Sequence, residues 1–142
     1  MRKSVLKALL FAIVILLLAL AGGSFYMLNY ALGAQRLPYS TYYSQLYEQE
    51  PSIGEWADSL KRAGALRDTL VVLSDGERSH ALYARHSAAR GKTAILVHGY
   101  KDAAVKMLPY AKLYHDMGMN FVLPDLHGHG LSDGDDIQMG WK

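Results

Sequence analysis

The sequence predicts a mixed α/β domain that follows one long apolar helix. Two observations indicate the α/β class: residues 70–85 carry an antiparallel hairpin signal, and residues 93–124 carry a strand–helix–strand pattern. A third observation, an uncharged stretch from Ala8 to Gln35, indicates the preceding helix. The length of 142 residues leaves room for one small domain or for part of a larger one.

Composition excludes several classes of protein. Hydrophobic residues make up 51% of the chain and charged residues 20%, which is too apolar for disorder and too charged for a polytopic membrane protein. Three of the 15 basic residues precede the apolar stretch. From residue 36 onward the chain therefore has 12 basic residues and all 13 acidic residues, which nearly balance. This balance leaves no basic patch, and we expect no nucleic-acid partner. The absence of cysteine excludes disulfides, thiolate nucleophiles, cysteine-based zinc sites and lipoprotein acylation.

The apolar stretch predicts a membrane helix that contacts lipid through residues 8–32. A bilayer core needs about 20 apolar residues of helix, and this stretch is long enough. Three basic residues precede it, namely Arg2, Lys3 and Lys7. The positive-inside rule therefore places the N-terminus in the cytoplasm and the domain outside the membrane, in a single-pass arrangement.

The alternative to an anchor is a cleaved signal peptide. Ala19-Leu20-Ala21 is a small-x-small site after a basic segment, so cleavage near Ala21 would release a secreted protein. The apolar stretch continues past this site to Leu32, however, and aromatic residues follow where an interface belt would lie. These features favour an uncleaved signal anchor over residues 1–35.

Residues 36–66 are predicted to be a juxtamembrane linker followed by a helix. The tyrosine-rich part, residues 36–52, is typical of a linker or a short helix near lipid headgroups. Ser52 and Glu55 have the spacing of a capping box, which predicts a helix that runs through about Ala63 with Gly64 as its stop.

The hairpin signal lies in residues 70–85. Residues 70–74 read as one strand and residues 80–85 as the returning strand. Asp75-Gly76 between them predicts a two-residue turn.

A parallel βαβ unit is predicted to follow the hairpin. Residues 93–97 and 120–124 read as strands buried on both faces. Residues 102–117 read as an amphipathic helix that Pro109 should kink or shorten, with Gly118 at its end.

Candidate chemistry lies in two polar, glycine-rich loops that follow the strands of this unit, residues 98–101 and 125–134. In an open α/β sheet, ligands bind beyond the carboxyl ends of the strands. A glycine at that position lets backbone N–H groups turn toward a substrate oxygen, as an oxyanion hole requires. We interpret His98 as a buried, hydrogen-bonded imidazole in a tight turn. The functional prediction rests on the backbone N–H of Tyr100.

These segments carry a resemblance to a known family. Ala94-Ile-Leu-Val-His-Gly-Tyr100, a helix, and then Asn120-Phe-Val-Leu-Pro-Asp-Leu-His-Gly-His-Gly-Leu-Ser-Asp-Gly134 resemble the N-terminal half of an α/β-hydrolase sheet. Within that fold the chain is most similar to membrane-anchored bacterial hydrolases of the serine aminopeptidase-like and esterase-like branch. The resemblance covers roughly residues 58–142. Family members usually have arginine where this chain has His127.

The resemblance implies a serine hydrolase of the bacterial cell membrane that acts on ester, amide or peptide bonds of a small-molecule or peptide substrate without a cofactor or metal. It makes Tyr100 an oxyanion donor. The residues that shape the site are then His98, Gly99, Asp125, Gly128 and Gly130. The nucleophile, acid and histidine are expected beyond Lys142, so residues 67–142 would be a partial hydrolase domain. A chain of these residues alone is expected to lack catalysis.

Gly130-Leu-Ser132-Asp-Gly134 matches the G-x-S-x-G string of a nucleophile elbow, but we reject Ser132 as the nucleophile. An elbow joins a strand directly to a helix, whereas Gly130 lies five residues beyond Asp125 inside a loop. No histidine follows Ser132, so the order of a hydrolase triad also fails.

Two other interpretations stay open at this point. A metal-dependent hydrolase would use the ligand types gathered in the second loop, namely Asp125, His127, His129, Asp133, Asp135 and Asp136. A non-catalytic, membrane-tethered module, or a truncated gene product, would keep the hydrolase framework without the reaction.

Overall fold

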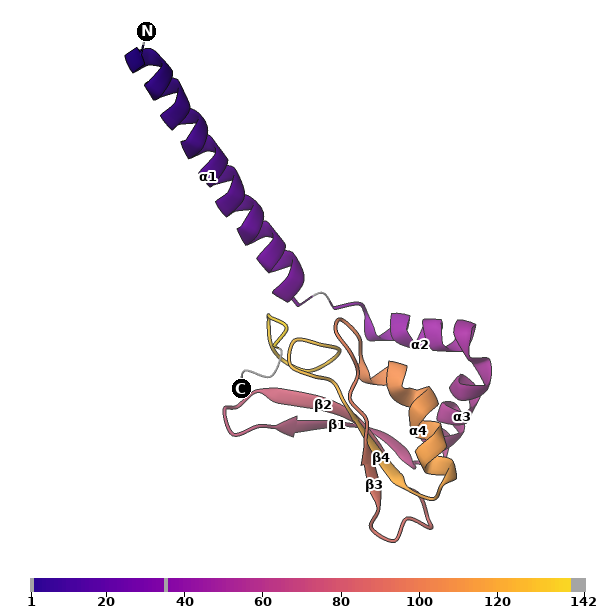
Figure 1. Cartoon of the computed structure of the whole chain (residues 1–142). Helices are drawn as coiled ribbons and strands as arrows, with labels where there is room; N and C mark the ends of the chain where they lie inside the picture. Colours follow the sequence, from indigo (N-terminus) through magenta and orange to yellow (C-terminus); the bar gives the residue numbers. More distant parts are fainter. Residues whose placement is uncertain (1, 35, 139–142) are drawn as a thin grey trace. The chain divides into compact units, whose positions relative to one another are not determined.

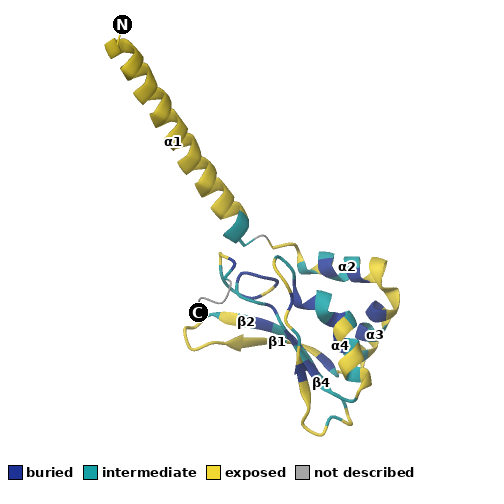
Figure 2. Cartoon of the chain, viewed as in Figure 1, coloured by how far each residue is buried: buried dark blue, intermediate teal, exposed yellow. Residues whose placement is uncertain are grey.

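The computed structural model describes residues 2–34 and 36–138, which form two compact units that divide after Gly33. The first unit contains one helix, α1 (Arg2–Leu32), of 31 residues (Figure 1). At 1.5 Å per residue α1 is about 46 Å long, more than the hydrocarbon core of a bilayer. It is long and apolar enough to cross a membrane, and residues 2–30 are all exposed (Figure 2).

The second unit is built on a four-stranded sheet of mixed direction. Its strands are β1 (Leu66–Val72), β2 (Arg78–Ala84), β3 (Thr93–Ile95) and β4 (Asn120–Pro124), in the order β1-β2-β4-β3. β2 pairs antiparallel with both β1 and β4, whereas β3 pairs parallel with β4. The predicted hairpin and the predicted parallel unit are both confirmed.

Helices cover one face of this sheet. They are α2 (Tyr39–Gln49), α3 (Pro51–Arg62), the 3₁₀ turn η1 (Ala104–Met107) and α4 (Leu108–Asp116). α3 contacts β1, η1 contacts β2 and β4, and α4 contacts β4 (Figure 1). The buried apolar side chains between the layers are Tyr42, Leu46, Ile53, Ala57, Leu66, Leu82, Ala84, Ala103, Ala104, Val105, Leu108, Ala111, Phe121 and Leu123.

The helix predicted near residues 52–63 is present as α3, and residues 36–52, expected to be a linker or a short helix, contain α2, which packs within the folded unit. Tyr42 and Leu46 of α2 lie four residues apart on one helix face, and both are buried in the core. The predicted capping box is wrong. Glu50 is the N-cap of α3 and Pro51 begins the helix, with no side-chain cap bond. Proline suits the first helical position, since its fixed φ angle is already helical.

The hairpin differs from its prediction in two ways. β1 begins at Leu66, four residues earlier than expected, because Leu66 packs into the core beneath the helices. The connection is a three-residue loop rather than a two-residue turn, since the N–H of Leu73 donates to the carbonyl of Glu77 across residues 74–76. Gly76 takes the left-handed position that such a loop requires, with φ of 87°.

The α-helix in the connection from β3 to β4 is shorter than predicted. The expected helix over residues 102–117 begins as η1 and becomes α-helical at Leu108, with Pro109 in its first turn. Gly118 ends it with φ of 77°. The shortening near Pro109 and the stop at Gly118 are confirmed.

Burial of β3 and β4 on both faces is wrong. β3 ends at Ile95, and the side chains of Ile95 and Val97 are 69% and 52% exposed. β3 is an edge strand, and the helices cover only the face that carries Ala94, Phe121 and Leu123.

Candidate active site

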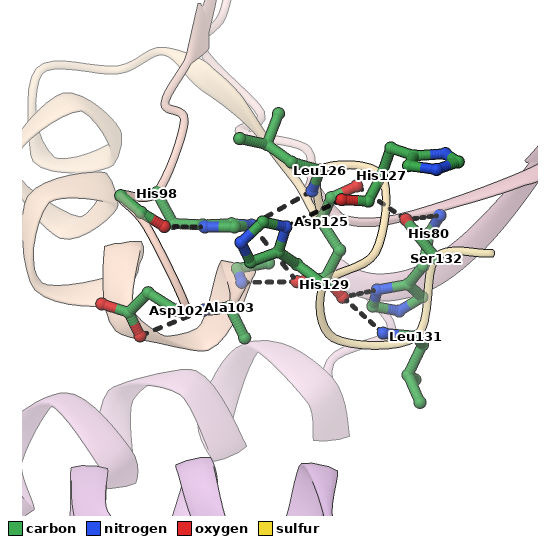
Figure 3. A network of polar contacts seen from close by, with 12 residues as sticks. His80, His98, Asp102, Ala103, Asp125, Leu126, His127, His129, Leu131 and Ser132 are labelled. Carbon is green, nitrogen blue, oxygen red and sulfur yellow. Dashed lines mark hydrogen bonds and ion pairs between the residues drawn. The ribbon is translucent and has the colours of Figure 1, made fainter. Parts of the chain in front are cut away.

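Two loops meet at the carboxyl end of the parallel strand pair. We call residues 96–103, after β3, the first loop, and residues 125–134, after β4, the second loop. The N–H of Leu126 in the second loop donates to Nε2 of His98 in the first, at 3.1 Å (Figure 3). The N–H of Lys101 in the first loop donates to Nε2 of His129 in the second, also at 3.1 Å. The candidate loops predicted from the sequence are thus joined.

Asp125 connects the second loop to the rest of the fold. Its buried carboxylate accepts the N–H of Ala104 at 2.7 Å and the N–H of Leu131 at 3.0 Å (Figure 3). The Ala104 bond ties the end of β4 to the start of η1, and the Leu131 bond folds the second loop back over Asp125. The carboxylate therefore orders both loops around it.

His80 of β2 completes this polar centre, and the sequence analysis did not identify it. Its Nδ1 lies 2.7 Å from Oδ2 of Asp125, and its Nε2 lies 3.3 Å from Oδ1 of Asp68. Burial alone would lower the pKa of His80, but Asp125 and then Asp68 outweigh burial and the pKa is raised. Burial alone would raise the pKa of Asp125, but His80 and the two backbone donors outweigh it and the pKa is lowered.

The helical layer covers the side chain of His80. The ring of Tyr39, in α2, meets the His80 imidazole edge-on with centroids 5.3 Å apart. The segment predicted as a linker or a short helix therefore helps to bury the ion pair. No motif marks His80, since its partner Asp125 lies 45 residues away and meets it only because β2 pairs with β4.

Glycines of the second loop are required where the loop closes tightly. Gly130 has φ of 49°, and a Cβ there would collide with the Asp125 carboxylate. Gly128 has φ of 72°, and a Cβ there would collide with the backbone carbonyl of Asp136. Both glycines named from the sequence thus serve close backbone approach.

In the first loop the conformationally unusual residue is Lys101 and not Gly99, the residue expected from the sequence. Lys101 has φ of 56°, the one left-handed non-glycine among residues 2–34 and 36–138, whereas Gly99 is not left-handed. The N–H of Asp102 donates to the carbonyl of Gly99 at 3.3 Å, which closes a β-turn with Lys101 at its third position. Tyr100, at the second position, is 52% exposed.

His98 is buried and hydrogen-bonded through both ring nitrogens, as its interpretation from the sequence required. Nδ1 lies 2.8 Å from the carbonyl oxygen of Gly99, and Nε2 accepts the N–H of Leu126. The imidazole is thus occupied with backbone groups of both loops.

Ser132 has the environment of a structural residue. It is buried, its hydroxyl donates to the carbonyl of Asp125 at 2.6 Å, and it accepts the N–H of His80 at 2.8 Å. The hydroxyl therefore closes the second loop against β2. This geometry agrees with the rejection of Ser132 as a nucleophile.

The ligands of the metal interpretation do not come together. His127 lies between Glu77 and Asp136, at 2.9 and 3.1 Å, where two carboxylates face its two ring nitrogens. Asp133 pairs with Arg78 at 2.9 Å. Within the described part of the chain, no three histidine or acidic side chains form a group that could bind a metal ion. The metal-dependent interpretation is therefore not supported by the placement of these residues.

Comparison with known proteins rests on structure. No protein-family model matches the sequence, and no curated protein matches it. A solved esterase from Pyrococcus furiosus is 22% identical, with a TM-score of 0.50 over 58% of this chain and 33% of the esterase. The fold is that of α/β-hydrolases. The chain spans only about a third of that esterase.

Other solved structures with this fold are more distant. An α/β-hydrolase from Vibrio vulnificus is 16% identical, with a TM-score of 0.49 over 78% of this chain and 44% of that one. A mutant epoxide hydrolase from Aspergillus niger is 18% identical, with a TM-score of 0.41 over 66% of this chain and 27% of that one.

Proposed function

We propose that the chain is the N-terminal part of a membrane-anchored serine hydrolase that cleaves ester, amide or peptide bonds through an acyl-enzyme. The α/β-hydrolase fold supports this assignment. The observation that carries it is the junction of the two loops beyond β3 and β4, where Tyr100 lies in a turn fixed by contacts to both loops. Substrates of open α/β sheets bind at this end of the strands.

Tyr100 would act through its backbone. When a serine attacks the substrate carbonyl, negative charge develops on the carbonyl oxygen, and preorganised N–H donors stabilise that charge. The N–H of Tyr100 is one such donor in this proposal. The serine, its base histidine and the acid would come from residues after Lys142, because Ser132 is buried and committed to β2 and Asp125.

The α1 helix supports an anchored location. It is 31 residues long, and Arg2, Lys3 and Lys7 lie in its first turns. We infer a cytoplasmic N-terminus and a domain on the outer side of the membrane. The mass of the mature protein distinguishes this arrangement from cleavage near Ala21, since cleavage removes the first 21 residues and releases the remainder from membranes.

A serine-reactive fluorophosphonate tests the proposed reaction. Membranes from cells that express the gene at its own locus are labelled, and the product is captured with an antibody raised against residues 36–138. We expect a labelled protein heavier than the 15.7 kDa chain, while the 142-residue chain itself is not labelled. Captured protein without any label would contradict the proposal and would support a non-catalytic tethered module.

A further inference from the structure

The two buried histidines of the candidate site share one protonation pattern. Nδ1 of His98 faces the carbonyl of Gly99, and Nδ1 of His129 faces the carbonyl of His127, both at 2.8 Å. Nε2 of each ring accepts a backbone N–H. A carbonyl only accepts and an amide N–H only donates, so each ring carries its hydrogen on Nδ1.

The bonds to these rings run in both directions between the loops. His98 belongs to the first loop and accepts from Leu126 of the second, while His129 belongs to the second and accepts from Lys101 of the first. The two rings lie side by side, with centroids 4.9 Å apart, and Figure 3 shows both beside Asp125. Burial lowers the pKa of His129, which favours the neutral ring that this arrangement needs.

Tyr100 lies between the two peptide groups that these rings contact. The carbonyl of Gly99 and the N–H of Tyr100 belong to one planar trans peptide group, in which they point in opposite directions. The bond from His98 to that carbonyl therefore sends the N–H of Tyr100 away from the His98 ring. The peptide group between Tyr100 and Lys101 carries the N–H of Lys101, which donates to Nε2 of His129.

The contact at Lys101 also selects the type of turn. Residues 99–102 form a turn whose third residue, Lys101, has φ of 56°, as a type II turn requires. Type I and type II turns differ by a flip of the central peptide group, and lysine at φ above zero disfavours type II. His129 accepts the N–H of that central group and so stabilises the flipped orientation.

We propose that His98 and His129 are positioning residues that fix the two peptide groups on either side of Tyr100, and thereby aim its N–H at the oxygen of a bound acyl substrate. This inference rests on the proposed function and names the residues that preorganise its oxyanion donor. Neither ring contacts the substrate. Each acts through the backbone of the first loop.

Amide hydrogen exchange in the full chain, in detergent micelles, tests the proposal without any need for activity. His129→Asn keeps a donor at the position of Nδ1 but has no group that reaches the N–H of Lys101. His129→Gln is the matched control, since its side-chain oxygen reaches the position of Nε2. We expect exchange at Lys101 to accelerate about tenfold in His129→Asn and to stay near the natural rate in His129→Gln.

The exchange rate at Leu126 separates positioning from general support of the loops. Its acceptor is His98, so its rate should not change in either variant. Unchanged exchange at Lys101 in His129→Asn would overturn the proposal, as would equal acceleration at Lys101 and Leu126. If His129→Asn does not fold, scalar coupling across the bond from Lys101 N–H to His129 Nε2 in the natural chain decides the matter. Detection of the coupling supports the proposal, and its absence overturns it.

A failure of the fluorophosphonate test would leave these exchange results intact. A failure of the exchange test would leave the hydrolase proposal intact and would remove only the role of the two histidines.

Discussion

Nδ1 of His80 lies 2.7 Å from Oδ2 of Asp125, and both side chains are almost fully buried. The pair joins β2 to the end of β4, and the same carboxylate accepts the N–H groups of Ala104 and Leu131. One ion pair therefore links the sheet, the start of η1 and the second loop. The geometry of the candidate site depends on this link.

Asp125→Asn should destabilise the folded unit strongly. The substitution leaves His80 buried without its charged partner, and breaking a buried pair costs about 3 kcal/mol or more. Urea unfolding followed by tryptophan fluorescence measures the change. Asp133→Asn is the matched control, because its pair with Arg78 is exposed and should contribute little. Equal losses for the two variants would contradict a central role for Asp125.

Stability should depend on pH through the same pair. The pKa of His80 is raised, so its contribution is fully present below the unfolded value of 6.5 and is lost as the pH rises through the folded value. The pKa of Asp125 is lowered, so its contribution is present above the unfolded value of 3.8 and is lost as the pH falls through the folded value. Urea midpoints should therefore fall on both sides of a maximum.

His80→Gln is the variant that checks this assignment. It removes the titrating ring, so the alkaline decrease of the urea midpoint should become smaller. The acid decrease should persist in part, because the N–H groups of Ala104 and Leu131 still donate to Asp125. An alkaline decrease of the same size in His80→Gln and in the natural chain would assign the effect to another group.

Gly130→Ala should cost more than an ordinary substitution at a left-handed glycine. Its Cβ would meet the Asp125 carboxylate, and φ is 49°. Gly64→Ala is the control, with φ of 66° and no atom within 4 Å of the added carbon. We expect a loss of about 1 kcal/mol for Gly64→Ala from the backbone alone. Overpacking should add about 2 kcal/mol for Gly130→Ala. Equal losses, measured by urea unfolding, would show that the second loop relaxes to admit a methyl group.

Ser132→Ala should destabilise the chain without touching a reactive group. The hydroxyl makes two buried hydrogen bonds, and its removal leaves the N–H of His80 unpaired at a cost of about 1–3 kcal/mol. Mass spectrometry after fluorophosphonate treatment of the 142-residue chain should find Ser132 unmodified. Phosphonylation of Ser132 would show that Ser132 can act as a nucleophile.

Much of the fold could be predicted because its signals are local. The apolar runs that became β3 and β4, Gly118 at the end of α4 and the glycines of the second loop each reflect a conformation that nearby residues impose. The joined loops followed from the parallel pairing alone, since parallel strands end at the same edge of a sheet.

The failures arose where distant residues decide the outcome. Residues 36–52 were expected to be a linker or a short helix near lipid headgroups because they are rich in tyrosine. Only the sheet beneath Tyr42 and Leu46 makes α2 part of the core. Lys101 takes the left-handed conformation in a turn whose central N–H donates to His129 of the other loop, a contact that no local rule predicts. His80 was missed because its partner Asp125 lies 45 residues away, directly after β4, and meets it only through the pairing of β2 with β4.

Tyr100→Pro removes the proposed oxyanion donor, the backbone N–H of residue 100. Proline lacks the N–H and suits the second position of a type II turn, so the first loop should keep its shape. Tyr100→Phe is the control, because it keeps the N–H. The measurement is the steady-state hydrolysis of an activated ester by the fluorophosphonate-reactive membrane protein. Loss of about 100-fold in kcat for Tyr100→Pro, with KM little changed and Tyr100→Phe near the natural rate, is the predicted result. A natural kcat in Tyr100→Pro would show that the N–H of residue 100 does not stabilise the transition state.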